Sequence, residues 1–135
     1  MKKQSPYGRR LAPKLPLYHG TTSKSIKRID RDGLCTPKAC LGKQVWDLGD
    51  VHSECRKNAI YVSPFKEMAE DYAIYAATEH GGKPVVYVIE RWDKRCKLYE
   101  DPESDPDAED SFQMAISGCK CIRPTRRYYA PRHLR

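Results

Sequence analysis

The first residues whose types suggest chemistry are in the hexapeptide LYHGTT at residues 17–22, where Gly20 directly follows His19. A histidine ring can bond a hydroxyl group, and a glycine peptide lets a flat ligand lie against the backbone and pair with its N–H and C=O. The same pattern arises where a strand simply ends in a turn. Alone, the hexapeptide therefore indicates only half of a candidate ligand site.

Two tyrosines are candidates for the other half. In the segment AIYVSPFKEMAEDYA, Tyr61 closes an expected short strand and Tyr72 follows eleven residues later on an expected helix. Two rings placed in this way can hold a flat ring between them, each stack adding about 0.5–1.5 kcal/mol beyond burial. The alternative is that both are core aromatics, since Tyr72 falls on the apolar stripe of its helix.

Two strand–helix units position these residues. Residues 17–19 are predicted to form a short strand, followed by a helix that Thr22 or Ser23 caps and Gly33 ends. Residues 59–62 are predicted to form a second strand. The helix after it begins with serine at the N-cap and proline at the first position, ends at residues 81–82, and has the apolar stripe Phe65, Met68, Ala69, Tyr72, Ala73 and Ala76.

The remaining segments complete one α+β domain over residues 17–135, after a basic, proline-broken extended lead-in at residues 1–16. Residues 85–89 are apolar enough for a strand in the middle of a sheet. Residues 92–99 are expected to extend this strand or to pair with it. Further strands are expected at residues 112–116 and 121–122, and irregular structure at residues 35–58.

Charge and cysteine content restrict the class of protein. The net charge is +7, although residues 100–110 hold seven acidic side chains and no basic one. The rest of the chain is therefore strongly basic, which favours an anionic partner such as nucleic acid or a phosphorylated cofactor. The alternative is that the positive charge serves only to keep the protein soluble. The six cysteines lack a paired Cys-x2-Cys set, so reduced structural thiols are predicted, with no metal. No secretory signal or membrane span is apparent.

The order of these motifs resembles the ADP-ribosyltransferase fold. The motifs span roughly residues 17–122. In chain order they are YHGT, a helix ending in GL, IYVS with a later YA, and a hydrophobic strand. They are most similar to the His-Tyr-Glu branch, the poly(ADP-ribose) polymerases and diphtheria-type toxins. The resemblance implies short, mostly antiparallel strands in a split sheet, one or two flanking helices, and NAD as substrate.

The resemblance also implies roles for single residues. In the family the histidine bonds the adenosine ribose, the glycine backbone bonds the nicotinamide amide, and two tyrosines flank the nicotinamide ring. These positions correspond to His19, Gly20, Tyr61 and Tyr72, with Thr21 and Ser63 expected among the binding residues. The family often has a small hydroxyl residue three positions before the second tyrosine, where this chain has Ala69.

The third family position is a glutamate that opens a late strand, and it falls on Gln113 here. Glutamine can hold a ribose hydroxyl but is a poor general base, so single-unit transfer is expected rather than chain extension. Glu109 and Asp110 are nearby carboxylates that a small shift in register would bring to this position. The expected catalytic residues are His19, Tyr61 and Gln113.

The function implied is mono-ADP-ribosyl transfer from NAD to a protein side chain or, given the basic charge, to RNA or DNA. A monomeric bacterial toxin or effector acting in a cytoplasm is expected, with an immunity or antitoxin protein as a candidate partner. Alternatives are an RNA 2′-phosphotransferase, an NAD glycohydrolase or a non-catalytic NAD- or ADP-ribose-binding module. No P-loop or Gly-x-Gly-x-x-Gly follows a strand, and the candidates for the diphosphate are Lys24, Arg28 and Arg31.

Overall fold

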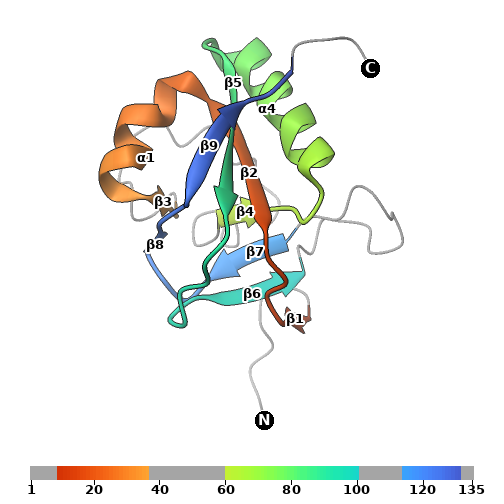
Figure 1. The fold of residues 1–135 in the computed structure, drawn as a ribbon, viewed down its shortest axis with the longest axis vertical. Helices are drawn as coiled ribbons and strands as arrows, with labels where there is room; N and C mark the ends of the chain where they lie inside the picture. The colour runs from red at the N-terminus through yellow and green to blue at the C-terminus, as the bar shows by residue number, and fades with distance from the viewer. Residues whose placement is uncertain (1–8, 37–59, 101–113, 132–135) are drawn as a thin grey trace, which may run out of the picture.

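The computed structural model describes residues 9–36, 60–100 and 114–131. These residues form short strands and two α-helices, arranged as in Figure 1. In chain order the elements are β1 (Arg10–Leu11), β2 (Leu17–Thr22), the 3-10 helix η1 (Ser23–Ser25), α1 (Ile26–Asp32), β3 (Leu34–Cys35), β4 (Ile60–Val62), α4 (Lys66–His80), β5 (Pro84–Ile89), β6 (Lys97–Glu100), β7 (Met114–Ser117), β8 (Cys121–Ile122) and β9 (Arg126–Tyr129).

The strands form two larger sheets and one small pair. Their orders are β1-β6-β7-β4, β2-β5-β9 and β3-β8, and every strand pairing in the described residues is antiparallel. The two larger sheets meet where Tyr18 N–H donates to Ser63 O at 2.8 Å and Ser63 N–H donates to Tyr18 O at 2.9 Å. The predicted class, a small α+β domain with antiparallel strands, is confirmed.

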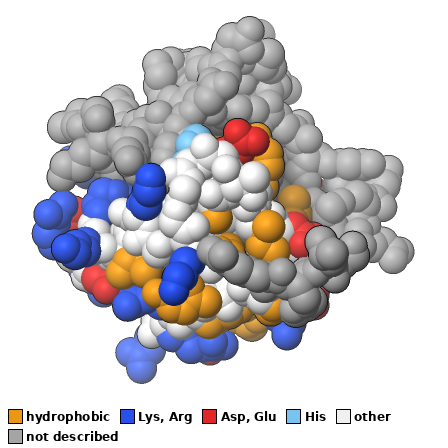
Figure 2. All heavy atoms as spheres, turned by 90° about the horizontal axis from the view of Figure 1, so that it is seen from above, with side chains coloured by type: hydrophobic (Ala, Val, Ile, Leu, Met, Phe, Trp, Pro, Cys, Tyr) orange, Lys and Arg blue, Asp and Glu red, His pale blue; other side chains and the backbone are white. Residues whose placement is uncertain are grey.

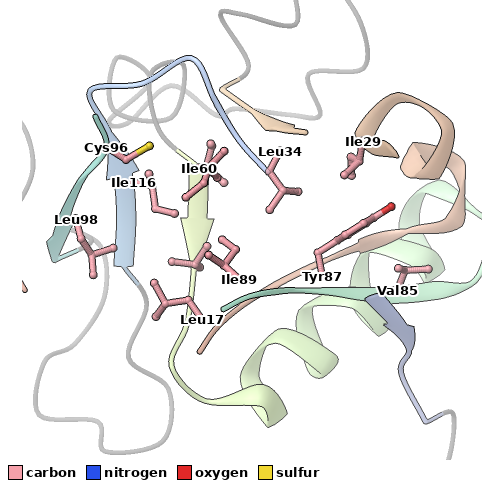
Figure 3. Close-up of a cluster of buried hydrophobic side chains, with 12 residues drawn as sticks. Leu17, Ile29, Leu34, Ile60, Val85, Tyr87, Ile89, Cys96, Leu98 and Ile116 are labelled. Atoms are coloured by element: carbon pink, nitrogen blue, oxygen red, sulfur yellow. The ribbon is translucent and has the colours of Figure 1, made fainter. Parts of the chain in front are cut away.

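The main core lies between these sheets. Leu17 and Ile89 of one sheet face Ile60, Leu98 and Ile116 of the other (Figure 3). The opposite face of β2-β5-β9 is covered by α4, and there Val86 packs with alanines of the helix in a second buried cluster. β5 is therefore buried on both faces, as its continuous apolar run predicts.

The first helix ends where the sequence predicts. Gly33 adopts a φ of 86°, and its N–H donates to Ile29 O at 2.7 Å. Thr22 Oγ1 accepts from Lys24 N–H at 3.3 Å, so the predicted threonine cap is present. It caps the 3-10 helix η1, and α1 follows directly from it.

The second helix, α4, begins later than predicted. Its first residue is Lys66, three residues after Ser63. Ser63 is fixed in extended conformation by its two backbone bonds to Tyr18, and its Oγ accepts from Phe65 N–H at 3.1 Å. The expected end of the helix is confirmed, because the Gly81 N–H donates to Ala77 O at 2.8 Å.

The buried face of α4 is narrower than the predicted stripe. Its buried residues are Ala69, Glu70, Ala73 and Ala76. Tyr72 is 44% exposed, so its placement as a core aromatic is wrong. Small side chains face the sheet because the backbones of α4 and β2 approach closely there. Glu70 is buried because its carboxylate accepts from the Tyr128 hydroxyl at 2.8 Å.

Three strands were not anticipated from the sequence: β1, β9 and β3, which lies where the end of a helix and irregular structure were expected. β1 lies within the predicted extended lead-in and pairs with β6, where Arg9 forms an ion pair with Glu100 at 2.9 Å. β9 pairs with β5 at the edge of the second sheet. β1 has two residues, and the sequence of β9 is RRYY, so neither shows the apolar alternation by which strands are recognised.

The cysteines differ from the prediction of reduced thiols. Cys35 is bonded to Cys121 and Cys96 to Cys119, so that prediction is wrong for all four described cysteines; Cys40 and Cys55 lie outside the described residues. Over residues 9–36, 60–100 and 114–131, no three His, Cys, Asp or Glu side chains are grouped as metal ligands. No helix in these ranges has the length and apolar character needed to cross a membrane.

Candidate active site

β2 positions His19 beside β4. The ring is partly buried, and its Nδ1 lies 2.7 Å from the carbonyl oxygen of Tyr61. A carbonyl can only accept, so Nδ1 carries the proton and donates to Tyr61 O. In the neutral ring, Nε2 then keeps its lone pair and can accept a hydrogen bond from a hydroxyl group.

The surroundings of His19 favour this neutral form. Burial lowers the pKa of His19 below 6.5, and this effect exceeds the rise in pKa due to the Tyr61 hydrogen bond. The charge of Arg28 lowers the pKa of His19 further. The ring is therefore neutral at pH 7, with one nitrogen committed to the fold and the other a hydrogen-bond acceptor.

The backbone of Gly20 points away from β5. Tyr18, two residues earlier on β2, directs its N–H and C=O to Ser63 rather than to β5. In an antiparallel pair, residues two apart direct their backbone polar groups to the same side. The N–H and C=O of Gly20 are thus directed to the side where β4 ends, beside His19. A planar carboxamide has the complementary acceptor and donors.

The bare Cα of Gly20 also has a purely structural cause. A Cβ at this position would lie 2.9 Å from Ala73 N and closer still to Ala69 O, both in the backbone of α4. Glycine is therefore required for α4 to pack on β2, whether or not a ligand binds. The sequence interpretation explained this glycine by a ligand or by a turn at the end of a strand. The strand β2 continues to Thr22, so no turn occurs at Gly20, and the helix contact is a further and independent explanation.

The two predicted tyrosines come from the elements that contact this part of β2. Tyr61 lies between the buried residues Ile60 and Val62 of β4, so its side chain points to the other side of the strand from theirs. Tyr72 immediately precedes Ala73, the residue of α4 that meets Gly20. Exposure of 44% leaves much of the Tyr72 ring accessible.

A third tyrosine, Tyr75, was missed by sequence reasoning. Its ring centroid lies 6.4 Å from that of Tyr72, with the planes tilted by 46°. It is 60% exposed. The signal that could have found it is the three-residue spacing from Tyr72, because residues three apart are neighbours on a helix surface.

Thr21 and Ser63 are both buried. Thr21 Oγ1 lies 3.5 Å from the Ser25 hydroxyl, and the Ser63 hydroxyl accepts from the backbone of Phe65. In this structure these hydroxyls stabilise the turns that follow β2 and β4.

The third motif position cannot be placed with the others. Gln113, Glu109 and Asp110 lie outside the described residues. β7 begins at Met114, which pairs with Val62, the residue after Tyr61.

The three basic candidates for the diphosphate are separated by the structure. Arg31 forms an ion pair with Asp32 at 2.9 Å. Lys24 lies against the end of α4, since a Cβ at Gly81 would be 3.0 Å from its Nζ. Arg28 is partly buried and its charge acts on His19. Arg28 is therefore the candidate whose charge is associated with this site.

Comparison with known proteins adds no family to this description. The chain matches no protein-family model, no curated protein and no solved structure. Its function is argued below from the residues around His19.

Proposed function

We propose that this protein is a mono-ADP-ribosyltransferase that transfers ADP-ribose from NAD to a macromolecular acceptor. The observation that carries the proposal is the pair of neighbours on β2. His19 is fixed through Nδ1 to the Tyr61 carbonyl, and Gly20 directs its backbone N–H and C=O to the side where β4 ends. The motif order that resembles the His-Tyr-Glu branch supports the same function.

Each residue has a role that its chemistry allows. The Nε2 of His19 accepts a hydrogen bond from a hydroxyl of the adenosine ribose. Gly20 donates its N–H to the carboxamide oxygen of nicotinamide and accepts from the amide nitrogen through its C=O. The rings of Tyr61 and Tyr72 flank the nicotinamide, and Gln113 holds a ribose hydroxyl through its amide.

This set of residues suits the chemistry of NAD. The nicotinamide of NAD is already cationic and leaves as a neutral ring, so no acid must protonate it, unlike the leaving group of an ordinary glycoside. The site has to orient the ribose and stabilise an oxocarbenium-like transition state. A neutral His19 adds no positive charge beside this cation, and tyrosine faces attract it.

The wider setting is part of the proposal. A monomeric toxin or effector that acts in a cytoplasm, and is inhibited by an immunity or antitoxin protein, fits a small domain of this kind. Glutamine at position 113 favours transfer of a single ADP-ribose unit.

The direct experiment follows both products of the reaction. The full chain is incubated with NAD labelled in its adenylate half and a cell lysate, and nicotinamide release and macromolecular label are measured before and after protease or nuclease. Macromolecular label that protease removes and nuclease does not confirms transfer to a protein. Label that nuclease removes and protease does not confirms transfer to a nucleic acid.

The other outcomes separate the alternatives. Nicotinamide release without label transfer indicates an NAD glycohydrolase, and NAD binding in calorimetry without turnover indicates a non-catalytic module. Loss of a 2′-phosphate from RNA indicates the phosphotransferase. A folded sample that neither binds nor cleaves NAD contradicts the proposal.

A further inference from the structure

The side of the molecule formed by α1 and β9 concentrates cationic side chains. Lys27 and Arg31 lie one turn apart on the same face of α1. Residues 114–131, which include β8 and β9, contain four basic side chains and no acidic one. Figure 2 shows Lys and Arg side chains gathered along this side, with hydrophobic side chains among them.

Two arginines join β8 and β9 to α1. The Nη1 of Arg127 donates to both carboxylate oxygens of Asp30 at 2.8 Å. Arg123 donates to the carbonyl oxygens of Asp30 and Arg31, each at 3.1 Å. The cations of α1 and β9 therefore lie on one continuous surface, the α1–β9 face, defined here by Lys27, Arg31, Lys83, Arg123, Arg127 and Tyr129.

An exposed aromatic ring lies within this face. Tyr129 is 58% exposed and is two residues after Arg127, so the two side chains share one side of β9. The Nζ of Lys83 lies 5.8 Å from the centroid of the Tyr129 ring. A flat aromatic surface with a cation beside it is thus presented to solvent at the edge of the sheet.

The charge of the face is positive after its own ion pairs are counted. Its five cations are accompanied by two carboxylates, Asp30 and Asp32, which pair with Arg127 and Arg31. In contrast, α4 carries four acidic residues and one lysine. The positive charge of the protein is therefore not spread evenly over the described surface.

We propose that the α1–β9 face binds single-stranded nucleic acid. Cationic side chains that follow a phosphate backbone, together with an aromatic ring on which a base stacks, are the two features that single-strand binding requires. The cations alone would serve any polyanion. Tyr129 favours a single strand, because the bases of a duplex are already stacked on one another.

The first test uses two double variants that remove the same charge. Binding of a fluorescent single-stranded RNA of about 16 nucleotides to the full chain is measured by anisotropy, without NAD, over a range of salt concentrations. Lys27→Ala with Lys83→Ala should weaken binding about tenfold and reduce the salt slope by about 1.4. Lys94→Ala with Lys97→Ala, two exposed lysines near β6, should change affinity less than about twofold.

The second test isolates the aromatic contribution. Tyr129→Ala should weaken single-strand binding about tenfold, and Tyr129→Phe should retain it, because stacking needs the ring and not the hydroxyl. Tyr75→Ala is the matched control, since Tyr75 is 60% exposed on α4. Circular dichroism of each variant confirms that it is folded.

Three results would overturn the proposal. The first is an equal loss of RNA affinity in the two lysine double variants, and the second is wild-type RNA affinity in Tyr129→Ala. The third is that duplex DNA or anionic vesicles bind as tightly as the single-stranded RNA, with an affinity that Tyr129→Ala does not change. The last result identifies a general polyanion surface instead. Because the assay contains no NAD, failure here leaves the proposed ADP-ribosyl transfer untouched.

Discussion

At the scale of single residues, the geometry of His19 accounts for its proposed role. The Tyr61 carbonyl fixes one ring nitrogen, and burial keeps the ring neutral by lowering its pKa. The sequence predicted a hydrogen-bonding histidine beside a bare glycine. It could not predict the Tyr61 contact, because the two residues are 42 positions apart in the chain and lie next to the bridge between Tyr18 and Ser63, which joins two sheets.

The first prediction concerns the pH dependence of catalysis. The pKa of His19 is lowered from 6.5, so nicotinamide release should be level near pH 7 and decline only as the pH falls below 6.5. Protonation converts Nε2 from an acceptor into a donor and ends its bond to a ribose hydroxyl. A rate against pH profile measures this, and activity that rises on acidification would contradict it.

The same shift affects folding stability. In the unfolded chain His19 takes up a proton near its ordinary pKa of 6.5, whereas the folded ring resists protonation until lower pH. The unfolded state therefore binds more protons in that window, and the contribution of His19 to the free energy of unfolding falls as pH decreases below 6.5. In His19→Asn, this part of the acid dependence should disappear.

The second prediction concerns Tyr72. Because its ring is 44% exposed, Tyr72→Ala should leave the melting temperature almost unchanged and reduce nicotinamide release about two- to tenfold through loss of one stack. Tyr72→Phe should retain activity. Tyr129→Ala, which removes a comparably exposed ring on β9, should release nicotinamide at the wild-type rate; a similar loss there would count against a specific role for Tyr72.

At the scale of elements, the order of strands and helices around the site was predictable, and their packing was not. Gly33 and Gly81 end the helices as expected, because a glycine after a periodic segment is a local signal. The exposure of Tyr72 was not predictable from periodicity. It results from the close approach of α4 to Gly20, which selects alanines for the buried face and leaves the larger tyrosines outside.

The third prediction tests that approach. Gly20→Ala places a Cβ against the backbone of α4, which cannot move aside as a flexible side chain can. It should lower the free energy of unfolding by about 3 kcal/mol, at the upper end for overpacking. Gly118→Ala is the control. Its φ of 84° is unfavourable for alanine, but the atom nearest to the new Cβ would be 3.3 Å away, so a loss of about 1–2 kcal/mol is expected. If chemical denaturation gave the same decrease in the free energy of unfolding for both variants, the contact with α4 would not be what restricts position 20 to glycine.

At the scale of the whole molecule, two disulfides link segments that are far apart in sequence. Cys35 and Cys121 are directly opposite each other in the β3–β8 pair, and Cys119 lies in the turn before β8. Cysteine spacing alone favoured reduced thiols, since separations of 86 and 23 residues form no local motif. Only the pairing of the strands reveals the bonds.

The fourth prediction follows from these bonds. Closing loops of 86 and 23 residues restricts the unfolded chain and contributes about 3–5 kcal/mol for each bond in the chain-entropy model. A reducing agent should therefore lower the melting temperature by about 10 °C or more. Cys35→Ala with Cys121→Ala should reproduce much of this loss, whereas an unchanged melting temperature on reduction would show that the bonds do not stabilise the fold.

Disulfides also bear on where the protein is made. Such bonds persist in oxidising compartments and are rare in a cytosol, in contrast to the predicted cytoplasmic site of action. The proposed delivery into a target cell is compatible with both, because the chain can fold in an oxidising compartment before it enters.

The measurement that tests the central claim most directly is the rate of nicotinamide release from NAD by the folded chain and by His19→Ala. We predict saturable release by the wild type and a rate about 100-fold lower in the variant, with both proteins folded by circular dichroism. A folded wild type that releases no nicotinamide, or a His19→Ala variant as active as the wild type, would contradict the assignment of this site to NAD.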